Sequence, residues 1–318
     1  MDKLIISSSP HVHSKNTTQK IMADVLIALL PSSVIAVILF GLKALLILAV
    51  CVGSCVISEF LFNLIVKKKQ TVSDLSACVT GVLLALSLPA TAGVWHCIVG
   101  SVFAIVVVKC LFGGIGCNFA NPAVTARVFL FVAFASSIGG GTATNFQGAE
   151  FASSATPLAA IKSGATAALP SITDMLIGNR AGAIGETCVI ALVIGGIYLI
   201  ARRVINWHSP VIYIATVFVL SLIIKQDVKI ALYEILGGGL MIAAFFMITD
   251  YSTTPINKYG KMVFAFGCGL ITVLIRFFGV YPEGVSFAIL LMNIVSPYIE
   301  QAFARKPLGK EDGKNEKK

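Results

Sequence analysis

Apolar runs fill most of this chain, and their length limits the folds that it can adopt. A transmembrane helix needs about 20 predominantly apolar residues, because the hydrocarbon core of a bilayer is about 30 Å thick. The composition agrees, since 57% of the residues are hydrophobic and 12% are charged, against about 25% charged residues in soluble domains. We predict an all-α polytopic membrane protein with about ten transmembrane helices, the third of which is also compatible with a re-entrant element. The candidate spans are 24–41, 44–66, 75–92, 94–112, 122–140, 182–201, 210–225, 231–248, 261–280 and 284–302.

The 24 basic residues are unevenly distributed among the segments that connect these spans. With the N-terminus inside, most of them lie in cytoplasmic segments, Lys109 and Arg127 included, as the positive-inside rule requires. We therefore expect both termini on the cytoplasmic side of a multi-pass protein. The placement of the basic residues thus accounts for the net charge of +9, and we expect membrane lipid as a partner and no nucleic acid. The first apolar run follows about twenty polar residues, so we expect no cleaved signal peptide.

The spans form two groups separated by a long connection. Residues 141–181 make a segment of about 40 residues that this topology places on the outer face, and connections of this length are usually functional or disordered. The two helix groups are 24–140 and 182–302, and they lie between a cytoplasmic N-terminal segment, 1–23, and a basic cytoplasmic tail, 303–318.

Two prolyl turns suggest a weak internal repeat. LSLP at 86–89 precedes Asn121-Pro122 by about the same distance as LSLI at 220–223 precedes Thr254-Pro255. Each prolyl dipeptide follows a long apolar helix and opens another. Two structural halves suit many transport folds, whose binding sites form where broken helices meet.

Polar residues gather in the turns that contain these prolines. In GGIGCNFANPAVTARVF, Pro122 fits the first turn of a helix, and Asn118 and Asn121 can cap free backbone groups. In MITDYSTTPINKYGK, Asp250 ends an apolar run and four hydroxyl residues follow it. The turn in GGIGCNFANPAVTARVF is compatible with a cofactor or ion site at a helix terminus, and equally with a glycine-rich connection between two helices.

Several acidic residues lie within or at the ends of apolar runs. Ionisable groups at membrane depth are costly, so a functional role is the default hypothesis for them. Glu59, Glu186 and Asp250 are the candidates for a Na⁺ or H⁺ path, whereas Glu234 and Glu283 fit boundary positions near helix ends. No metal-ligand cluster or hydrolase triad is recognisable. The eight cysteines lie almost entirely in apolar runs, where packing residues and iron–sulfur ligands are both compatible with the pattern.

A series of motifs gives a specific resemblance. SPHVHS, IMADVLIALLP, TGVLLALSLP, NFANPAVTARVF, ATPLAAIK, ALPS, IGNRAGAIGET, TDYSTTPIN and YPEGVSFAILLMN occur in this order over 9–302. The chain thereby resembles the family formed by the D-type membrane component of the Rnf complex, RnfD, and the corresponding component of the sodium-pumping NADH:quinone reductase, NqrB. The resemblance implies a ten-helix electron-transfer subunit in the bacterial cytoplasmic (inner) membrane. Its complex would be a ferredoxin:NAD⁺ oxidoreductase coupled to Na⁺ or H⁺ transport, and the isolated subunit would have no activity.

The resemblance also implies two flavins. One is an FMN joined to a threonine by a phosphoester in a motif of the form acid-x-x-S-[GST]-A-T, and the other is a non-covalent flavin, riboflavin. In EFASSATPL the motif places the FMN on Thr156, with Glu150, Ser153, Ser154 and Pro157 around it. The rival site is Thr166 in AAIKSGATAAL, which has Ala160 at the acidic position and lacks the proline.

Other residues take their expected places from the same resemblance and from the topology. The turn Gly185-Glu186-Thr187 should lie near the tethered FMN on the outer face. The turns that contain Asn118, Asn121 and Asp250 lie on the inner side, where a second flavin can bind.

The resemblance also implies partners. These are a flavin transferase and the other membrane and peripheral Rnf subunits, including the covalently flavinylated G subunit and the iron–sulfur and NAD-binding subunits. Two rival functions remain, a channel or secondary transporter without a redox role and a structural assembly subunit.

Overall fold

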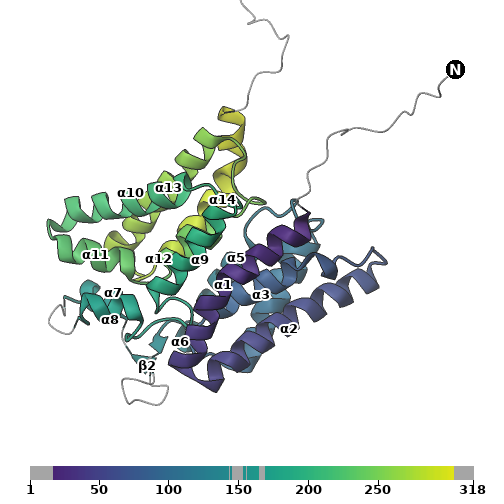
Figure 1. The fold of residues 1–318 in the computed structure, drawn as a ribbon, viewed down its shortest axis with the longest axis horizontal. Coiled ribbons are helices and arrows are strands. Elements are labelled where there is room, and N and C mark those ends of the chain that lie inside the picture. The colour runs from purple at the N-terminus through teal and green to yellow at the C-terminus, as the bar shows by residue number, and fades with distance from the viewer. Residues whose placement is uncertain (1–16, 143, 145–152, 155, 165–168, 304–318) are drawn as a thin grey trace, which may run out of the picture.

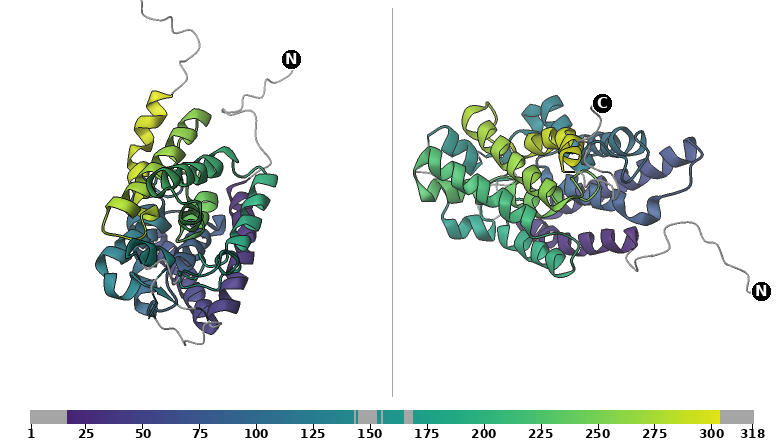
Figure 2. Two further views of the ribbon diagram at one scale, coloured as in Figure 1. Left: turned by 90° about the vertical axis from the view of Figure 1, so that its left-hand side faces the viewer. Right: turned by 90° about the horizontal axis from the view of Figure 1, so that it is seen from above.

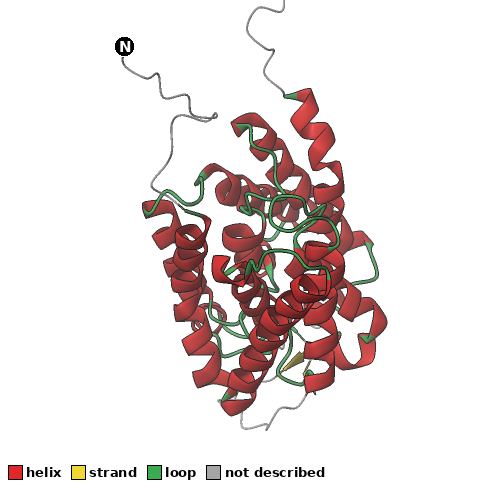
Figure 3. Cartoon of the chain, turned by 90° about the vertical axis from the view of Figure 1, so that its right-hand side faces the viewer, coloured by secondary structure: helices red, strands yellow, loops and turns green. Residues whose placement is uncertain are grey.

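The computed structural model describes residues 17–142, 144, 153–154, 156–164 and 169–303. Helices dominate these residues, and the one sheet among them has two strands (Figures 1 and 3). The longer elements are α1 (Thr18–Phe40), α2 (Leu42–Ile65), α3 (Ser76–Ser87), α4 (Val94–Val102), η2 (Phe103–Cys110), α5 (Pro122–Ala133), α9 (Val189–Ala201), α10 (His208–Lys225), α11 (Val228–Leu236), α13 (Lys258–Phe278) and α14 (Val285–Ala302). The shorter ones are η1 (Val72–Asp74), α6 (Ala135–Ile138), β1 (Gly141–Thr142), β2 (Ser153–Ser154), α7 (Pro157–Lys162), α8 (Ile172–Ile177), α12 (Leu240–Ile242) and η5 (Ala243–Met247).

Five of the described helices, α1, α2, α10, α13 and α14, are long and apolar enough to cross a membrane. A sixth span results if α11 and the α12–η5 segment, which are bent by 63° relative to each other, count as one. The other expected spans correspond to the shorter apolar helices α3, α4 with η2, α5 and α9. The chain is therefore an all-α polytopic membrane protein, and the number of ten spans stays a prediction.

Three of these helices are shorter than the sequence suggests, for local reasons. α3 ends at Ser87 because Pro89 forces the preceding residue, Leu88, into an extended conformation. α5 ends at Ala133, and α9 begins only at Val189, since 178–188 forms irregular turns.

Side-chain caps fix where several helices begin. Asn121 is the N-cap of α5 and accepts hydrogen bonds from the N–H groups of Ala123 and Val124, and Pro122 follows it at the first helical position. Asn257 caps α13 in the same way. The cap predicted at Asn121 and the first-turn position predicted for Pro122 are thus confirmed, whereas the cap predicted at Asn118 is wrong, because Asn118 Oδ1 accepts no hydrogen bond among the described residues.

The helices form two groups that lie side by side, α1 to α6 and α9 to α14 (Figures 1 and 2). α1 packs against α9 and α5 against α14, which joins the groups. The start of α1 and the end of α14 lie toward one end of the molecule, which we call the terminal end. β1, β2, α7 and α8 lie at the other, which we call the loop end (Figure 1).

Three consecutive glycines produce the bend between α11 and α12. Gly238 has a φ of +62°, a conformation that side chains rarely adopt. Arg276 of α13 donates from Nη1 to the carbonyl oxygen of Glu234 and from Nη2 to that of Gly237, at 2.5 and 3.3 Å. A buried cation therefore satisfies carbonyl groups that the end of α11 leaves without helical partners.

Candidate functional site

Thr156 occupies a defined position at the loop end, as the N-cap of α7. Its hydroxyl oxygen accepts a hydrogen bond from the N–H of Ala159 at 3.2 Å, and Pro157 occupies the first turn of the helix. The sequence ATPL thus has a local structural reason, because threonine and proline are favoured at these two positions. The same hydroxyl is the one that the sequence motif assigns to flavin attachment.

Thr156 lines a cavity of about 430 Å³, which we call the loop-end cavity, together with the glycines 139–141, Arg127 and Glu283. A Cβ atom at Gly141 would lie only 2.7 Å from Cγ2 of Thr156, so glycine permits the close approach of β1 to this threonine. β1 also pairs antiparallel with β2, with Gly141 opposite Ser154 and Thr142 opposite Ser153. The arrangement puts a threonine hydroxyl, a glycine-lined wall and an arginine around one space.

Lys162 anchors the far end of α7 to the second helix group. Its Nζ donates to the carbonyl oxygens of Gly279 and Tyr281 at 2.6 and 2.9 Å, just beyond the end of α13. Of the other residues in the two predicted attachment motifs, Glu150 and Thr166 lie outside the described residues. Ser153 and Ser154 form β2 and pair through their backbones with β1.

Glu186 and Glu283 both contact Arg127 near this cavity. Arg127 Nη2 lies 2.7 Å from Glu186 Oε1 and 2.5 Å from Glu283 Oε2. Among the described residues neither oxygen of Glu186 has a partner with hydrogen-bond geometry, although the carboxylate is buried. Burial, together with the nearby negative charge of Glu283, raises the pKa of Glu186, in the turn before α9, to about 7. Glu186 is thus a carboxyl group that titrates near neutral pH.

The turn around Glu186 packs on the chain that follows α3. The N–H of Gly185 donates to the carbonyl oxygen of Leu86 at 2.7 Å, and a Cβ atom at Gly185 would overlap with Cβ of Leu86. Arg180 donates from Nη2 to the carbonyl oxygen of Glu186 and from Nε to that of Thr187, at 2.6 and 3.4 Å. Gly185 and Thr187 therefore hold this turn in place, while Glu186 reaches the loop-end cavity only through Arg127.

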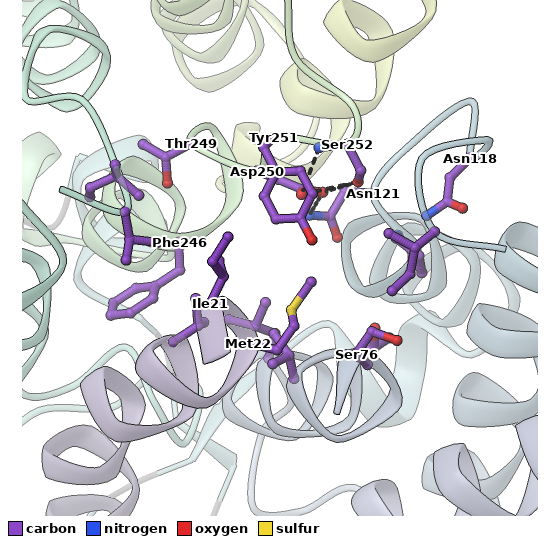
Figure 4. A pocket seen from close by; sticks show the side chains of 18 of the residues that line it. Ile21, Met22, Ser76, Asn118, Asn121, Phe246, Thr249, Asp250, Tyr251 and Ser252 are labelled. Atoms are coloured by element: carbon purple, nitrogen blue, oxygen red, sulfur yellow. Dashed lines mark hydrogen bonds between the residues drawn. The ribbon is translucent and has the colours of Figure 1, made fainter. Parts of the chain in front are cut away.

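A second cavity lies at the terminal end, between the two helix groups (Figure 4). It encloses about 750 Å³, part of it open to solvent. Its apolar wall comes from α1, α3 and η5, and its polar wall from the turns at 115–122 and 249–252. Its lining includes Met22, Ser76, Asn118, Asn121, Phe246 and Asp250.

The two polar turns meet in this terminal-end cavity, as Figure 4 shows. Asn121 Nδ2 donates to Asp250 Oδ2 at 3.2 Å, and Asp250 also accepts from the hydroxyls of Ser252 and Thr253. Asn118 lines the same space, and its Oδ1 is buried without a hydrogen-bond partner among the described residues. The structure therefore brings Asn118, Asn121 and Asp250 together, and it leaves one acceptor for a ligand.

Glu59 forms a buried ion pair beside this cavity. Lys109 Nζ lies 2.8 Å from both carboxylate oxygens of Glu59, and Thr71 donates to the same carboxylate at 2.6 Å. Both charged side chains are almost fully buried. Lys109, but not Glu59, lines the terminal-end cavity.

Sequence reasoning missed the roles of Lys109 and Arg127. It counted both among the basic residues of cytoplasmic segments, whereas the structure buries them in ion pairs within η2 and α5. Glu283 does lie just before α14, as expected, but sequence reasoning did not foresee that it binds Arg127 and lines the loop-end cavity. A signal was available, because a buried carboxylate such as Glu59 or Glu186 requires a basic partner from a neighbouring apolar segment. Among the described residues, no group of three or more His, Cys, Asp or Glu side chains could hold a metal ion.

These features define a helical membrane protein with buried ion pairs and a cavity between its two helix groups. Residues 5–309 match the NQR2, RnfD, RnfE family, and the chain belongs to this family. It is 46% identical over 301 residues to the D subunit of the Na(+)-translocating ferredoxin:NAD(+) oxidoreductase complex of Acetobacterium woodii, and the match covers 94% of this chain and 93% of that protein. It is 38% identical over 308 residues to the D subunit of the proton-translocating ferredoxin:NAD(+) oxidoreductase complex of Clostridium ljungdahlii, with 93% of each chain covered. The family resemblance seen in the motifs is confirmed.

Proposed function

We propose that this chain is the flavin-carrying electron-transfer subunit of an ion-translocating ferredoxin:NAD⁺ oxidoreductase complex. The observation that carries the proposal is the position of Thr156, which caps a short helix and faces a glycine-lined cavity. The relatives support it, because they are named as D subunits of ferredoxin:NAD(+) oxidoreductase complexes. The complex would couple electron flow to Na⁺ or H⁺ transport. The relatives are named for different ions, so the ion itself requires a measurement.

The loop-end cavity has features that suit an FMN tethered to Thr156. Gly141 allows the backbone to approach the threonine, and the Arg127–Glu283 ion pair places charged groups of both signs on the cavity wall. A bound flavin supplies the electron-transfer chemistry, while the protein contributes binding, orientation and electrostatics. In this proposal Arg127, held by Glu186 and Glu283, fixes the charge beside the tethered cofactor.

The terminal-end cavity is our proposed site for the second, non-covalent flavin. Its apolar wall suits the faces of a planar ring system, and Asn118 offers a buried oxygen without a partner among the described residues. Asn121 and Asp250 hold the polar wall in place through their hydrogen bond.

Glu59, Glu186 and Asp250 remain our candidates for the ion path. They occupy three separate settings, an ion pair with Lys109, an ion pair with Arg127 and a cluster of amide and hydroxyl donors. A path through all three would run between the two ends of the molecule.

We also propose the topology and the partners that the motifs imply. The terminal end would face the cytoplasm and the loop end the outer side of a cytoplasmic membrane, where a flavin transferase can reach Thr156. The apolar surface would contact membrane lipid. The other Rnf subunits, including the G subunit and the iron–sulfur and NAD-binding subunits, would supply the sites for ferredoxin and NAD⁺.

Peptide mass spectrometry on the chain co-expressed with a flavin transferase tests this function. We expect an FMN-sized adduct on the peptide that contains Thr156. Thr156→Ala should remove it, and the matched variant Thr166→Ala should keep it. An adduct on Thr166 would keep the function and change the site.

A channel or secondary transporter is the main alternative, and a structural assembly subunit is the other. If an active transferase modified neither threonine and the purified complex held no flavin at all, the electron-transfer function would be wrong. Ion transport without bound flavin would then favour the transporter. The absence of both ion transport and bound flavin would favour the assembly subunit.

A further inference from the structure

A third cavity, of about 350 Å³, lies between α7, α10, α11 and α13 at the loop end. Its charged lining residues are Lys162, Lys225, Arg276 and Glu234, and its apolar lining includes Leu158 and Phe277. Neither proposed flavin site uses its two lysines. The cavity therefore combines positive charge with apolar walls.

The charges of this lysine cavity do not cancel. Glu234 lies 2.9 Å from Arg276 Nη1, and this buried pair is neutral as a unit. Asp227, the nearest acid along the chain, caps α11 by accepting from the N–H of Lys229 at 2.8 Å. Lys162 and Lys225 then supply an excess of positive charge to the cavity.

The cations that line this cavity retain donors for an anion. Arg276 is 4% exposed, and its Nε has no hydrogen-bond partner among the described residues. Lys162 uses two of the three donors of an ammonium group on the carbonyl oxygens of Gly279 and Tyr281. Lys225 lies over the ring of Phe277, 5.5 Å from its centroid, which is a contact that needs no oxygen acceptor. A group with several acceptor oxygens and a negative charge matches this set.

The surroundings of the cavity indicate an amphiphilic ligand. Phe278 and Val280, which follow the lining residue Phe277, are 73% and 86% exposed, and Val228 at the start of α11 is 54% exposed. Exposed apolar side chains of this size suit hydrocarbon in a membrane protein. An anionic group held beside them would belong to a molecule that also carries apolar chains.

We propose that the lysine cavity binds the phosphate group of an anionic membrane lipid. Basic pockets between membrane helices bind lipid head groups on the cytoplasmic side of membranes, and the same charge-assisted hydrogen bonds are available to a phosphate at the loop end. The apolar chains of the lipid would lie along Phe278 and Val280. Because Thr156 caps the start of α7, the lipid would also brace the helix that positions this threonine. The site does not require a bound flavin.

Native mass spectrometry of the full chain in detergent tests the site, with phosphatidylglycerol, phosphatidylcholine and diacylglycerol as probes. We expect phosphatidylglycerol to bind most tightly and diacylglycerol most weakly. Lys225→Gln should weaken phosphatidylglycerol binding about tenfold, the effect of losing one charge-assisted hydrogen bond. Lys225→Arg, which keeps the charge, should retain wild-type binding. Lys229 is exposed and lies outside the cavity, so Lys229→Gln should leave binding unchanged.

The phosphate could instead come from a flavin on Thr156, and the same assay separates the two sources. The lipid site predicts equal phosphatidylglycerol binding by the flavinylated chain and by Thr156→Ala. Binding only by Thr156→Ala would assign the cavity to the flavin phosphate and overturn the lipid. Equal losses in Lys225→Gln and Lys229→Gln would show general surface charge in place of a site. Because the lipid assay needs no flavin, its failure is distinguishable from failure of the proposed electron-transfer function.

Discussion

Asn121 and Asp250, which are 129 residues apart, join the two helix groups through one hydrogen bond of 3.2 Å. Asn121 has two tasks, because its Oδ1 caps α5 while its Nδ2 binds the Asp250 carboxylate. Both residues line the terminal-end cavity (Figure 4). The geometry of this cavity therefore depends on a side chain that also starts a helix.

The first prediction separates these two tasks of Asn121. In Asn121→Asp the new residue can still cap α5, but it places a second carboxylate beside Asp250 in a buried setting. We expect a loss of about 1–3 kcal/mol in the free energy of unfolding at neutral pH, because the Asp250 carboxylate loses the donor that Asn121 supplies. The loss should shrink at acidic pH, where one carboxyl group is protonated. Thermal unfolding in detergent at two pH values measures it.

Asn121→Ser is the matched control for this experiment, since serine also caps helices well and adds no charge. It should be less destabilising than Asn121→Asp at neutral pH and should show no relief at acidic pH. Equal stability of the two variants at neutral pH would contradict the contact between Asn121 and Asp250.

The second prediction concerns the buried pair of Glu59 and Lys109. Lys109→Met leaves the Glu59 carboxylate buried without its cation, and breaking one side of such a pair typically costs about 3–5 kcal/mol. Adding Glu59→Gln should recover part of this loss, because the unpaired charge is gone. Lys68→Met, at an exposed lysine, is the control and should have little effect. Unfolding midpoints of the two single variants, the double variant and the control measure the coupling, and additive losses would argue against the pair.

Some of this architecture could be predicted from sequence, and the reasons are local. Apolar runs and capping residues such as Asn121 depend only on neighbouring residues in the chain. The helical class and the start of α5 could therefore be predicted from the sequence. For the turns of Asn121 and Asp250, the sequence predicted only that both lie on the same side of the membrane, and it did not predict their contact. The ion pairs of Lys109 and Arg127 were not predicted, since they join residues far apart in sequence. The irregular turn before Val189, which shortens α9, depends on packing against α3 and leaves no periodic signal.

The third prediction uses two glycines in different surroundings. A Cβ atom at Gly185 would overlap with Cβ of Leu86, whereas one at Gly53 in α2 would meet no atom within 4 Å. Gly185→Ala should therefore lower the free energy of unfolding by about 1–3 kcal/mol, as overpacking does. Gly53→Ala should leave stability unchanged or raise it by up to about 1 kcal/mol, because alanine favours helix. Thermal unfolding of both variants gives the comparison, and a stable Gly185→Ala would contradict the close packing of this turn on Leu86.

The last prediction is a pH dependence that Glu186 causes. Its pKa in the folded protein is about 7, above the value near 4.5 of an ordinary glutamate, because burial and Glu283 disfavour the charged form. Between these two values the folded state binds more protons than the unfolded state, so stability should fall as the pH rises from about 5 to 7. Above pH 7 this contribution is lost and the dependence should level off.

Glu186→Gln tests this assignment because glutamine resembles the protonated carboxyl group and does not titrate. The difference in unfolding midpoint between wild type and Glu186→Gln should change steadily between pH 5 and 7, with wild type relatively more stable at the acidic end. Asp174→Asn is the control, since Asp174 lies in the short helix α8 and its pKa is lowered by the hydroxyl of Ser171. Its effect should not vary between pH 5 and 7. A flat difference for Glu186→Gln over this range would show that Glu186 is ionised throughout, with Arg127 outweighing burial.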